Sequence, residues 1–119
     1  MKDIYHCIHE LVAYNAGLQI AHWRANTITN EHKTLGDLYD KMIDLTDEFN
    51  EVYMGKYGMI AFKDGIKIPD VSSKPCKMGM TVVSDLKEYF RAGDDDDLLN
   101  IIADMEIQLN RSKYLLKEK

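Results

Sequence analysis

The segment IAHWRANTITNEHKTLGDLYDKMIDLTDEFNE, Ile20 to Glu51, decides the fold, because it contains the end of one helix, a break and the start of another. The break is ANTITN, residues 25–30. Within it, the side chain of Thr29 or Asn30 can accept an orphan backbone N–H and so begin the second helix. Because only a few residues separate the two helices, we expect them to lie antiparallel.

Apolar residues recur at three- and four-residue steps on both sides of this break, as they do along one face of a helix. The pattern before the break predicts a helix over residues 3–26, in which Gly17 is a weak point explained by close approach of a neighbouring helix. This helix aligns Ile4, Ile8, Leu11, Asn15, Leu18 and His22 on one face. The pattern after the break predicts a second helix over residues 31–54, ended by Gly55 and Gly58. Its apolar stripe consists of Leu35, Leu38, Met42, Leu45, Phe49, Val52 and Tyr53.

The rest of the sequence predicts a long irregular connection and two further helices. Residues 55–80 hold four of the seven glycines and both prolines, with Asp64-Gly65 in the pattern of a tight hairpin turn. A connection of this length indicates a crossover along the bundle. A short helix is expected over residues 81–92, stopped by Gly93. A last helix is expected over residues 97–117, preceded by the acidic run of residues 94–97, whose carboxylates stabilise a helix N-terminus. The sequence therefore predicts one all-α domain over residues 1–119, a four-helix bundle with a short third helix.

The composition argues against several classes of function. The chain has 119 residues, 45% of them apolar, and a net charge of −5, which disfavours binding to nucleic acid or to anionic lipid. No apolar run approaches the roughly 20 residues of a membrane span, and the first ten residues are too polar for the core of a signal peptide. Lys2 is the only basic residue before the first predicted helix, which is too few for a DNA-binding tail, so DNA binding is not predicted. Cys7 and Cys76 form no CxxC pair, which favours buried or idle thiols in a reducing cytoplasm.

Histidines and carboxylates mark a candidate metal site. At 100° per residue, Asp40, Asp47 and Glu51 fall within a narrow arc beside the apolar stripe of the second helix, where we expect them to be half-buried. His22 lies on the apolar face of the first helix, and His32 lies in the first turn of the second. Imidazole together with carboxylate is a ligand set for iron, manganese or zinc. The alternatives are a hydrogen-bonded core histidine and an ordinary solvated acidic face.

A second histidine pair lies near the N-terminus. His6 and His9, with Glu10, have helical spacing and could hold a surface metal, although polar residues of a frayed first turn explain them better. The sequence has no nucleophile elbow, no glycine-rich phosphate loop and no CxxC redox pair, so metal chemistry is the enzymatic interpretation that the residues leave.

The segment that contains these residues resembles the Dps-like mini-ferritins, a branch of the ferritin-like superfamily. Their motif has His-Trp at the end of the first helix and a second His early in the next. An Asp follows the second His by four positions, another Asp by fifteen, and a Glu comes four further on. Here the corresponding residues are His22-Trp23, His32, Asp47 and Glu51. The resemblance covers residues 11–55 well and residues 92–119 more weakly, and it is absent from the middle of the chain.

The sequence departs from this family in three ways. Gly36 stands where the family has its first Asp ligand, and neither Asp37 nor Asp40 is an obvious substitute. The loop between the histidines is two residues shorter than usual, and the third helix is much shorter. The first departure bears on metal affinity and oxidation chemistry, and the third bears on the twelve-subunit shell of the family.

The resemblance implies a ferritin-like fold with a site shared between two subunits. His22 and His32 would come from one chain, and Asp47 and Glu51 from its two-fold mate. Asp40, which shares the helical arc of Asp47 and Glu51, is a further candidate metal ligand outside the family motif. The family implies a homo-oligomer, at least a dimer and at most a larger shell, that binds Fe(II) and passes its electrons to peroxide or dioxygen. Trp23 would pack beside the site or serve as a core anchor. The alternative is a ferritin-like bundle whose site has degenerated and which acts as a structural or interaction module.

Overall fold

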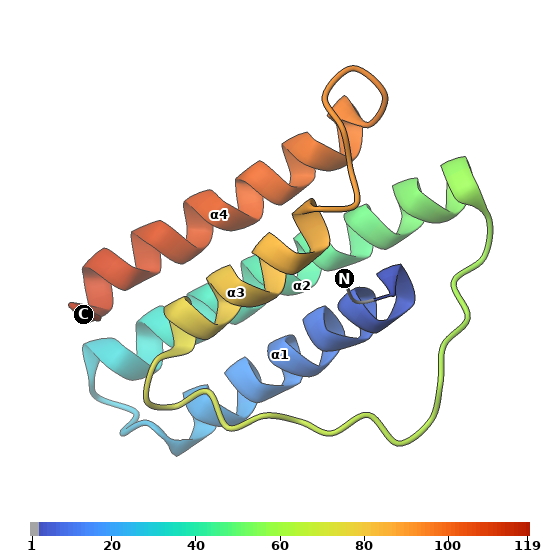
Figure 1. The fold of residues 1–119 in the computed structure, drawn as a ribbon. Coiled ribbons are helices and arrows are strands. Elements are labelled where there is room, and N and C mark those ends of the chain that lie inside the picture. Colours follow the sequence, from blue (N-terminus) through green and yellow to red (C-terminus); the bar gives the residue numbers. More distant parts are fainter. Residues whose placement is uncertain (1–2) are drawn as a thin grey trace.

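The computed structural model describes residues 3–119 and contains four helices (Figure 1). They are α1 (Ile4–Arg24), α2 (Asn30–Tyr57), α3 (Pro75–Lys87) and α4 (Asp96–Leu116). Helix α2 packs against α1 and α4, and α3 packs against the same two helices, whereas the backbones of the diagonal pairs within residues 3–119 do not come close to each other. This closed arrangement confirms the all-α four-helix bundle.

The hairpin of α1 and α2 begins and ends within three residues of its predicted bounds. The Asp3 carboxylate accepts a hydrogen bond from the Tyr5 amide and caps α1. Of the two candidate caps for α2, Thr29 takes the position, and its hydroxyl oxygen accepts from the His32 amide at 3.2 Å. Helix α2 ends at Gly58, whose φ of 98° only glycine adopts readily. Gly55 remains inside the helix, so the prediction that it helps to end α2 is wrong.

Residues 58–74 cross from the end of α2 to the start of α3, which is its diagonal neighbour, and run back along the length of the bundle as predicted (Figure 1). The crossover is not a hairpin, since no strand forms within residues 3–119, although Gly65 does adopt a positive φ of 76°. Ile60 and Val71 are buried and fasten it to the core. A Cβ at Gly17 would lie 2.7 Å from the Pro69 carbonyl oxygen, so the close approach expected there comes from this segment and not from a helix.

Helix α3 lies six residues earlier than predicted at its N-terminus and five earlier at its C-terminus. Pro75 starts it, because a proline in the first helical turn has no amide that needs a partner. Tyr14 fixes this end, since its hydroxyl donates to the Pro75 carbonyl oxygen at 2.7 Å. Tyr89 and Phe90 continue the apolar period past the end of the helix, and this period misplaced the prediction.

The core fills the space between the four helices and includes both cysteines, which are buried as expected and are not joined in a disulfide. Its largest fully buried side chains come from all four helices, with Tyr14 and Phe49 the largest. Within residues 3–119, no helix is both long and apolar enough to span a lipid bilayer.

Candidate metal centre

His22 and His32 face each other across the short turn between α1 and α2. Their rings are stacked, with centroids 3.9 Å apart and planes 28° from parallel. The Nδ1 atom of His22 lies 2.7 Å from the His32 carbonyl oxygen. The Nδ1 atom of His32 lies 2.8 Å from the His22 carbonyl oxygen. The two residues are therefore joined by a reciprocal pair of hydrogen bonds.

These hydrogen bonds determine which ring nitrogen carries the proton in each histidine. A carbonyl oxygen only accepts a hydrogen bond, so Nδ1 is the protonated nitrogen in both histidines. In a neutral imidazole the other nitrogen, Nε2, then carries the lone pair. Within residues 3–119, no hydrogen bond uses the Nε2 atom of His22 or His32. A ring whose Nδ1–H donates to a carbonyl while its Nε2 is available has the arrangement that metal-binding histidines adopt.

The same contacts also have a structural role. His22 belongs to the last turn of α1, whose carbonyl groups have no partner within the helix. The His32 imidazole satisfies one of these carbonyls, so the pair clamps the end of α1 to the start of α2. A purely structural interpretation of the histidines therefore accounts for both Nδ1 atoms, and it leaves both Nε2 atoms without a role.

The carboxylates predicted for the site lie further along α2. Asp40, Asp47 and Glu51 are all exposed in this single chain, which corrects the expectation that closing the bundle would half-bury them. The reason is that the arc beside the apolar stripe faces away from both α1 and α4. None of the three is hydrogen-bonded or ion-paired within residues 3–119. Asp37 forms an ion pair with Lys33 at 3.1 Å.

One chain does not assemble the predicted ligand set. No group of three or more His, Cys, Asp or Glu side chains lies close enough to hold a metal ion among residues 3–119. The structure brings His22 and His32 together and leaves the acids apart from them. A site with all four side chains would thus need a second subunit, as the resemblance also implies.

Polar side chains also lie inside the α1–α2 hairpin, and the sequence indicates only some of them. Asn15 lies in the predicted stripe of α1, and its side-chain amide donates to the Thr46 hydroxyl of α2 at 2.7 Å. The Asn15 Oδ1 atom and the Asn50 Oδ1 atom are buried without a hydrogen-bond partner within the described chain. A polar residue inside an apolar stripe was the signal for Asn15, but Thr46 has no such mark in the sequence.

Trp23 does not anchor the core. Its side chain is 64% exposed, so the core-anchor interpretation is wrong. The backbone places Trp23 about 100° around α1 from His22, because the two residues are consecutive. It points to solvent in this chain.

The N-terminal histidines differ from each other. His6 is exposed and forms an ion pair with Glu10 at 2.9 Å. His9 is buried and uses both ring nitrogens, since Nδ1 bonds the Tyr5 carbonyl oxygen and Nε2 accepts from the Lys63 amide at 2.9 Å. His9 is thus neither a frayed surface residue nor a metal ligand; it joins α1 to the crossover.

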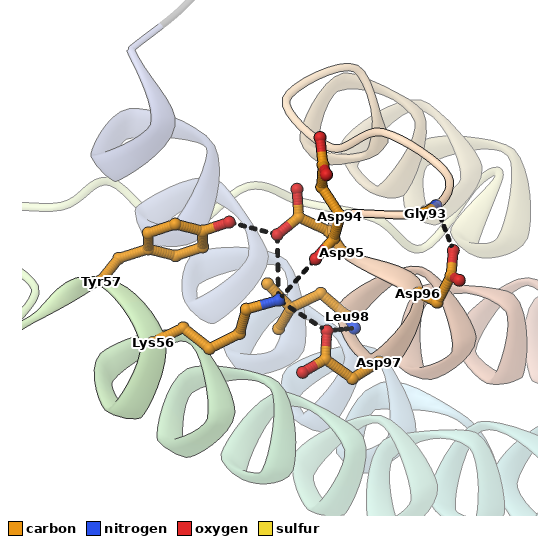
Figure 2. Close-up of polar contacts among 8 residues, drawn as sticks. All are labelled: Lys56, Tyr57, Gly93, Asp94, Asp95, Asp96, Asp97 and Leu98. Carbon is orange, nitrogen blue, oxygen red and sulfur yellow. Dashed lines mark hydrogen bonds and ion pairs between the residues drawn. The ribbon is translucent and has the colours of Figure 1, made fainter.

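The acidic run before α4 forms a cross-link and not a cation site (Figure 2). Lys56, near the end of α2, donates to Asp95 at 3.1 Å, to Asp97 at 2.9 Å and to the Asp94 carbonyl oxygen at 3.0 Å. The Tyr57 hydroxyl also donates to Asp95. Hydrogen bonds from Tyr57 and Lys56 lower the pKa of Asp95, and the bond from Lys56 lowers the pKa of Asp97. Helix α4 thus begins in the acidic run as predicted, and Lys56 of α2 partly neutralises the negative charge of that run.

The fold and the site define an all-α bundle whose helical hairpin carries a paired-imidazole centre. The sequence model of a family of unknown function, DUF5856, matches residues 22–116. The chain belongs to this family, and the match includes both histidines of the pair and the acidic face of α2. No curated protein and no solved structure matches the chain.

Proposed function

We propose that this protein binds iron at a site shared between two subunits, in the manner of the Dps-like mini-ferritins. His22 and His32 of one chain would supply imidazole nitrogens, and Asp47 and Glu51 of its two-fold mate would supply carboxylates, with Asp40 nearby. The observation that carries the proposal is the reciprocal hydrogen bonding of the two Nδ1 atoms, which leaves both Nε2 atoms available. Nitrogen and oxygen donors together suit iron, and manganese or zinc are the alternatives.

The charges of the chain favour this chemistry. Helix α2 presents several exposed carboxylates, and their negative charge attracts a cation. The reaction is the oxidation of Fe(II) as substrate: peroxide takes one electron from each of two ferrous ions and, with two protons, leaves as two waters. Carboxylates favour the ferric product because it carries the higher charge. Iron sequestration in an oligomer, as large as a shell, would follow from retention of that product.

Metal binding would change the imidazole pair in a measurable way. With metal–nitrogen bonds of about 2.1 Å, two rings on one ion have centroids roughly 4.6 Å or more apart. The stack at 3.9 Å would therefore have to open if both histidines bound the same ion. The ring-proton NMR signals of His22 and His32 report this opening with a diamagnetic ion such as Zn²⁺.

The experiment is an anaerobic Fe(II) titration followed by peroxide, read as ferric absorbance. His22→Ala and Asp47→Ala are each expected to abolish the rise. Glu48→Ala is the matched control, because Glu48 is also an exposed acid of α2 but is not among the predicted ligands. Identical traces for the wild type and both site variants would rule out the proposal.

A complementation experiment tests the sharing of the site. One variant lacks both histidines (His22→Ala, His32→Ala), and the other lacks both acids (Asp47→Ala, Glu51→Ala). Each is inactive alone, but random exchange of subunits regenerates about a quarter of the wild-type sites, because half the dimers are mixed and each has one intact site. No recovery after confirmed subunit exchange would contradict a shared site.

The second candidate is a bundle that serves as a structural or interaction module. The observation that favours it is the clamp function of the histidine pair, which needs no metal. It predicts that His22→Ala lowers the melting temperature while Fe(II), Mn(II) and Zn(II) leave the wild type unchanged.

A further inference from the structure

Gly36 lies immediately next to the His22 ring. A Cβ atom at this position would lie 2.7 Å from Cε1 and 2.9 Å from Nδ1 of His22. Non-bonded carbon atoms prefer separations of about 3.5–4.0 Å, so no side chain fits while the ring stays where it is. Glycine is a poor helix former, yet here it lies in the second turn of a long helix.

The position of the ring determines the geometry of the pair. In this place the His22 imidazole reaches the His32 carbonyl oxygen and stacks on the His32 ring. A side chain at residue 36 would push the imidazole away, breaking the hydrogen bond that holds the proton on Nδ1 and turning Nε2 to a new direction. We infer that Gly36 is a positioning residue of the imidazole pair, which deepens the proposed function and rests on it.

This role also explains the departure from the mini-ferritin pattern. An aspartate at residue 36 and the observed His22 ring would occupy the same space. Glycine at residue 36 thus supplies no carboxylate, but it leaves the space in which the two imidazoles can pair. On this basis the Gly36 substitution does not mark a decayed site; it is a requirement of the site that this chain builds.

The contact is tested by a thermal double-mutant cycle without metal. Gly36→Ala is expected to lower the melting temperature of the wild type but to raise it in the His22→Ala background, where the ring is gone and only the helix preference of alanine remains. Gly55→Ala is the matched control, because Gly55 lies in the same helix with nothing within 4 Å of its Cβ position, and it should raise the melting temperature in both backgrounds. A rise on Gly36→Ala in the wild type would overturn the inference.

The role at a metal site is tested with Co²⁺, whose visible absorption reports its coordination. Gly36→Ala is expected to weaken Co²⁺ binding about tenfold or more and to change the spectrum, as loss of a supporting contact does at metal sites. Gly55→Ala should leave both unchanged. A wild-type spectrum and affinity in Gly36→Ala would overturn the inference even if the melting temperature fell. Absence of Co²⁺ binding by the wild type would overturn the proposed function and with it the metal role, whereas the thermal cycle would still report the contact.

Discussion

Lys56 connects two helix ends through a single charged group. It contacts Asp95 and Asp97 at the start of α4 from a position near the end of α2, and the Tyr57 hydroxyl joins it on Asp95 (Figure 2). Hydrogen bonding to Asp97 raises the pKa of Lys56, while its two carboxylate partners have pKa values below the ordinary 3.8. Each shift means that the folded state favours the charged form of the group, so the contact should weaken both at low pH and at high pH.

The sign of the effect follows from linkage. Carboxylates with depressed pKa values stabilise the fold above pH 3.8 and lose that contribution as the pH falls below it. The raised pKa of Lys56 adds stability below its ordinary value of 10.5, which is lost as the pH rises through the folded-state pKa. Urea unfolding against pH should show both losses in the wild type and smaller ones in Lys56→Met. Lys41→Met, an exposed lysine of the same helix, should follow the wild-type curve; parallel curves for wild type and Lys56→Met would contradict the prediction.

Some residue-level features of the site were readable from the sequence and others were not. The proximity of His22 and His32 follows from a short connection between two helices, which brings the flanking turns together. Their hydrogen bonds could not be predicted, because the acceptors are backbone carbonyl groups whose positions depend on how the helices cross. The same limit applies to Gly36, where the sequence shows a glycine at the position for which the resemblance implies a carboxylate, and only the structure shows the His22 ring beside it.

At the scale of the elements, the helical spacing of apolar residues predicted the positions of α1, α2 and α4 well. Each has several turns with one apolar face, and each begins or ends at a side-chain cap, a glycine or an acidic run. Helix α3 has 13 residues, so a few apolar residues beyond its end were enough to shift the predicted range. The exposure of Asp40, Asp47 and Glu51 was also missed, because period alone does not show how far a neighbouring helix covers the border of a stripe.

The crossover is held to α1 by His9. Its imidazole accepts from the Lys63 amide, and its ring contacts the Phe62 ring edge-on with centroids 5.5 Å apart. His9→Ala removes the acceptor, and we expect a loss of about 1–3 kcal/mol in the free energy of unfolding. Hydrogen exchange should accelerate at the Lys63 amide and leave amides in α4 protected. His6→Ala is the control, since His6 is exposed and forms its ion pair with Glu10 on the same helix. Unchanged exchange at Lys63 in His9→Ala would show that other contacts hold the crossover.

At the scale of the whole molecule, residues near the C-terminal end of the sequence join helices at one end of the bundle. The Glu118 carboxylate accepts from the Cys76 amide at 2.9 Å and from the Lys77 amide at 2.7 Å. It thereby caps α3, whose own N-cap residue makes no side-chain hydrogen bond. Nearby, Asn30 of α2 donates to the Leu115 carbonyl oxygen of α4 at 2.8 Å. Three helices thus meet at this end of the bundle.

Glu118→Gln should weaken this junction by removing the negative charge at the α3 N-terminus. We expect a loss of about 0.5–2 kcal/mol, the range for a helix cap, and faster hydrogen exchange at the Cys76 and Lys77 amides. Asp104→Asn, an exposed acid of α4, serves as the control because it leaves net charge equal to that of Glu118→Gln. Equal stability of the two variants would mean that the charge of Glu118 contributes nothing to the cap.

The proposed site makes metal binding and association two parts of one equilibrium. The histidine pair and the acids do not meet within one chain, so an ion held by both must stabilise the dimer over the monomer. By linkage, Fe(II) or Mn(II) should lower the dimer dissociation constant measured by anaerobic sedimentation, and the metal affinity should rise with protein concentration. Asp47→Ala should remove this dependence, because it deletes a ligand from the partner's side of the site, whereas Glu48→Ala should preserve it. A metal affinity that is the same at every protein concentration, with monomers throughout, would place the ion within one subunit and exclude the shared arrangement.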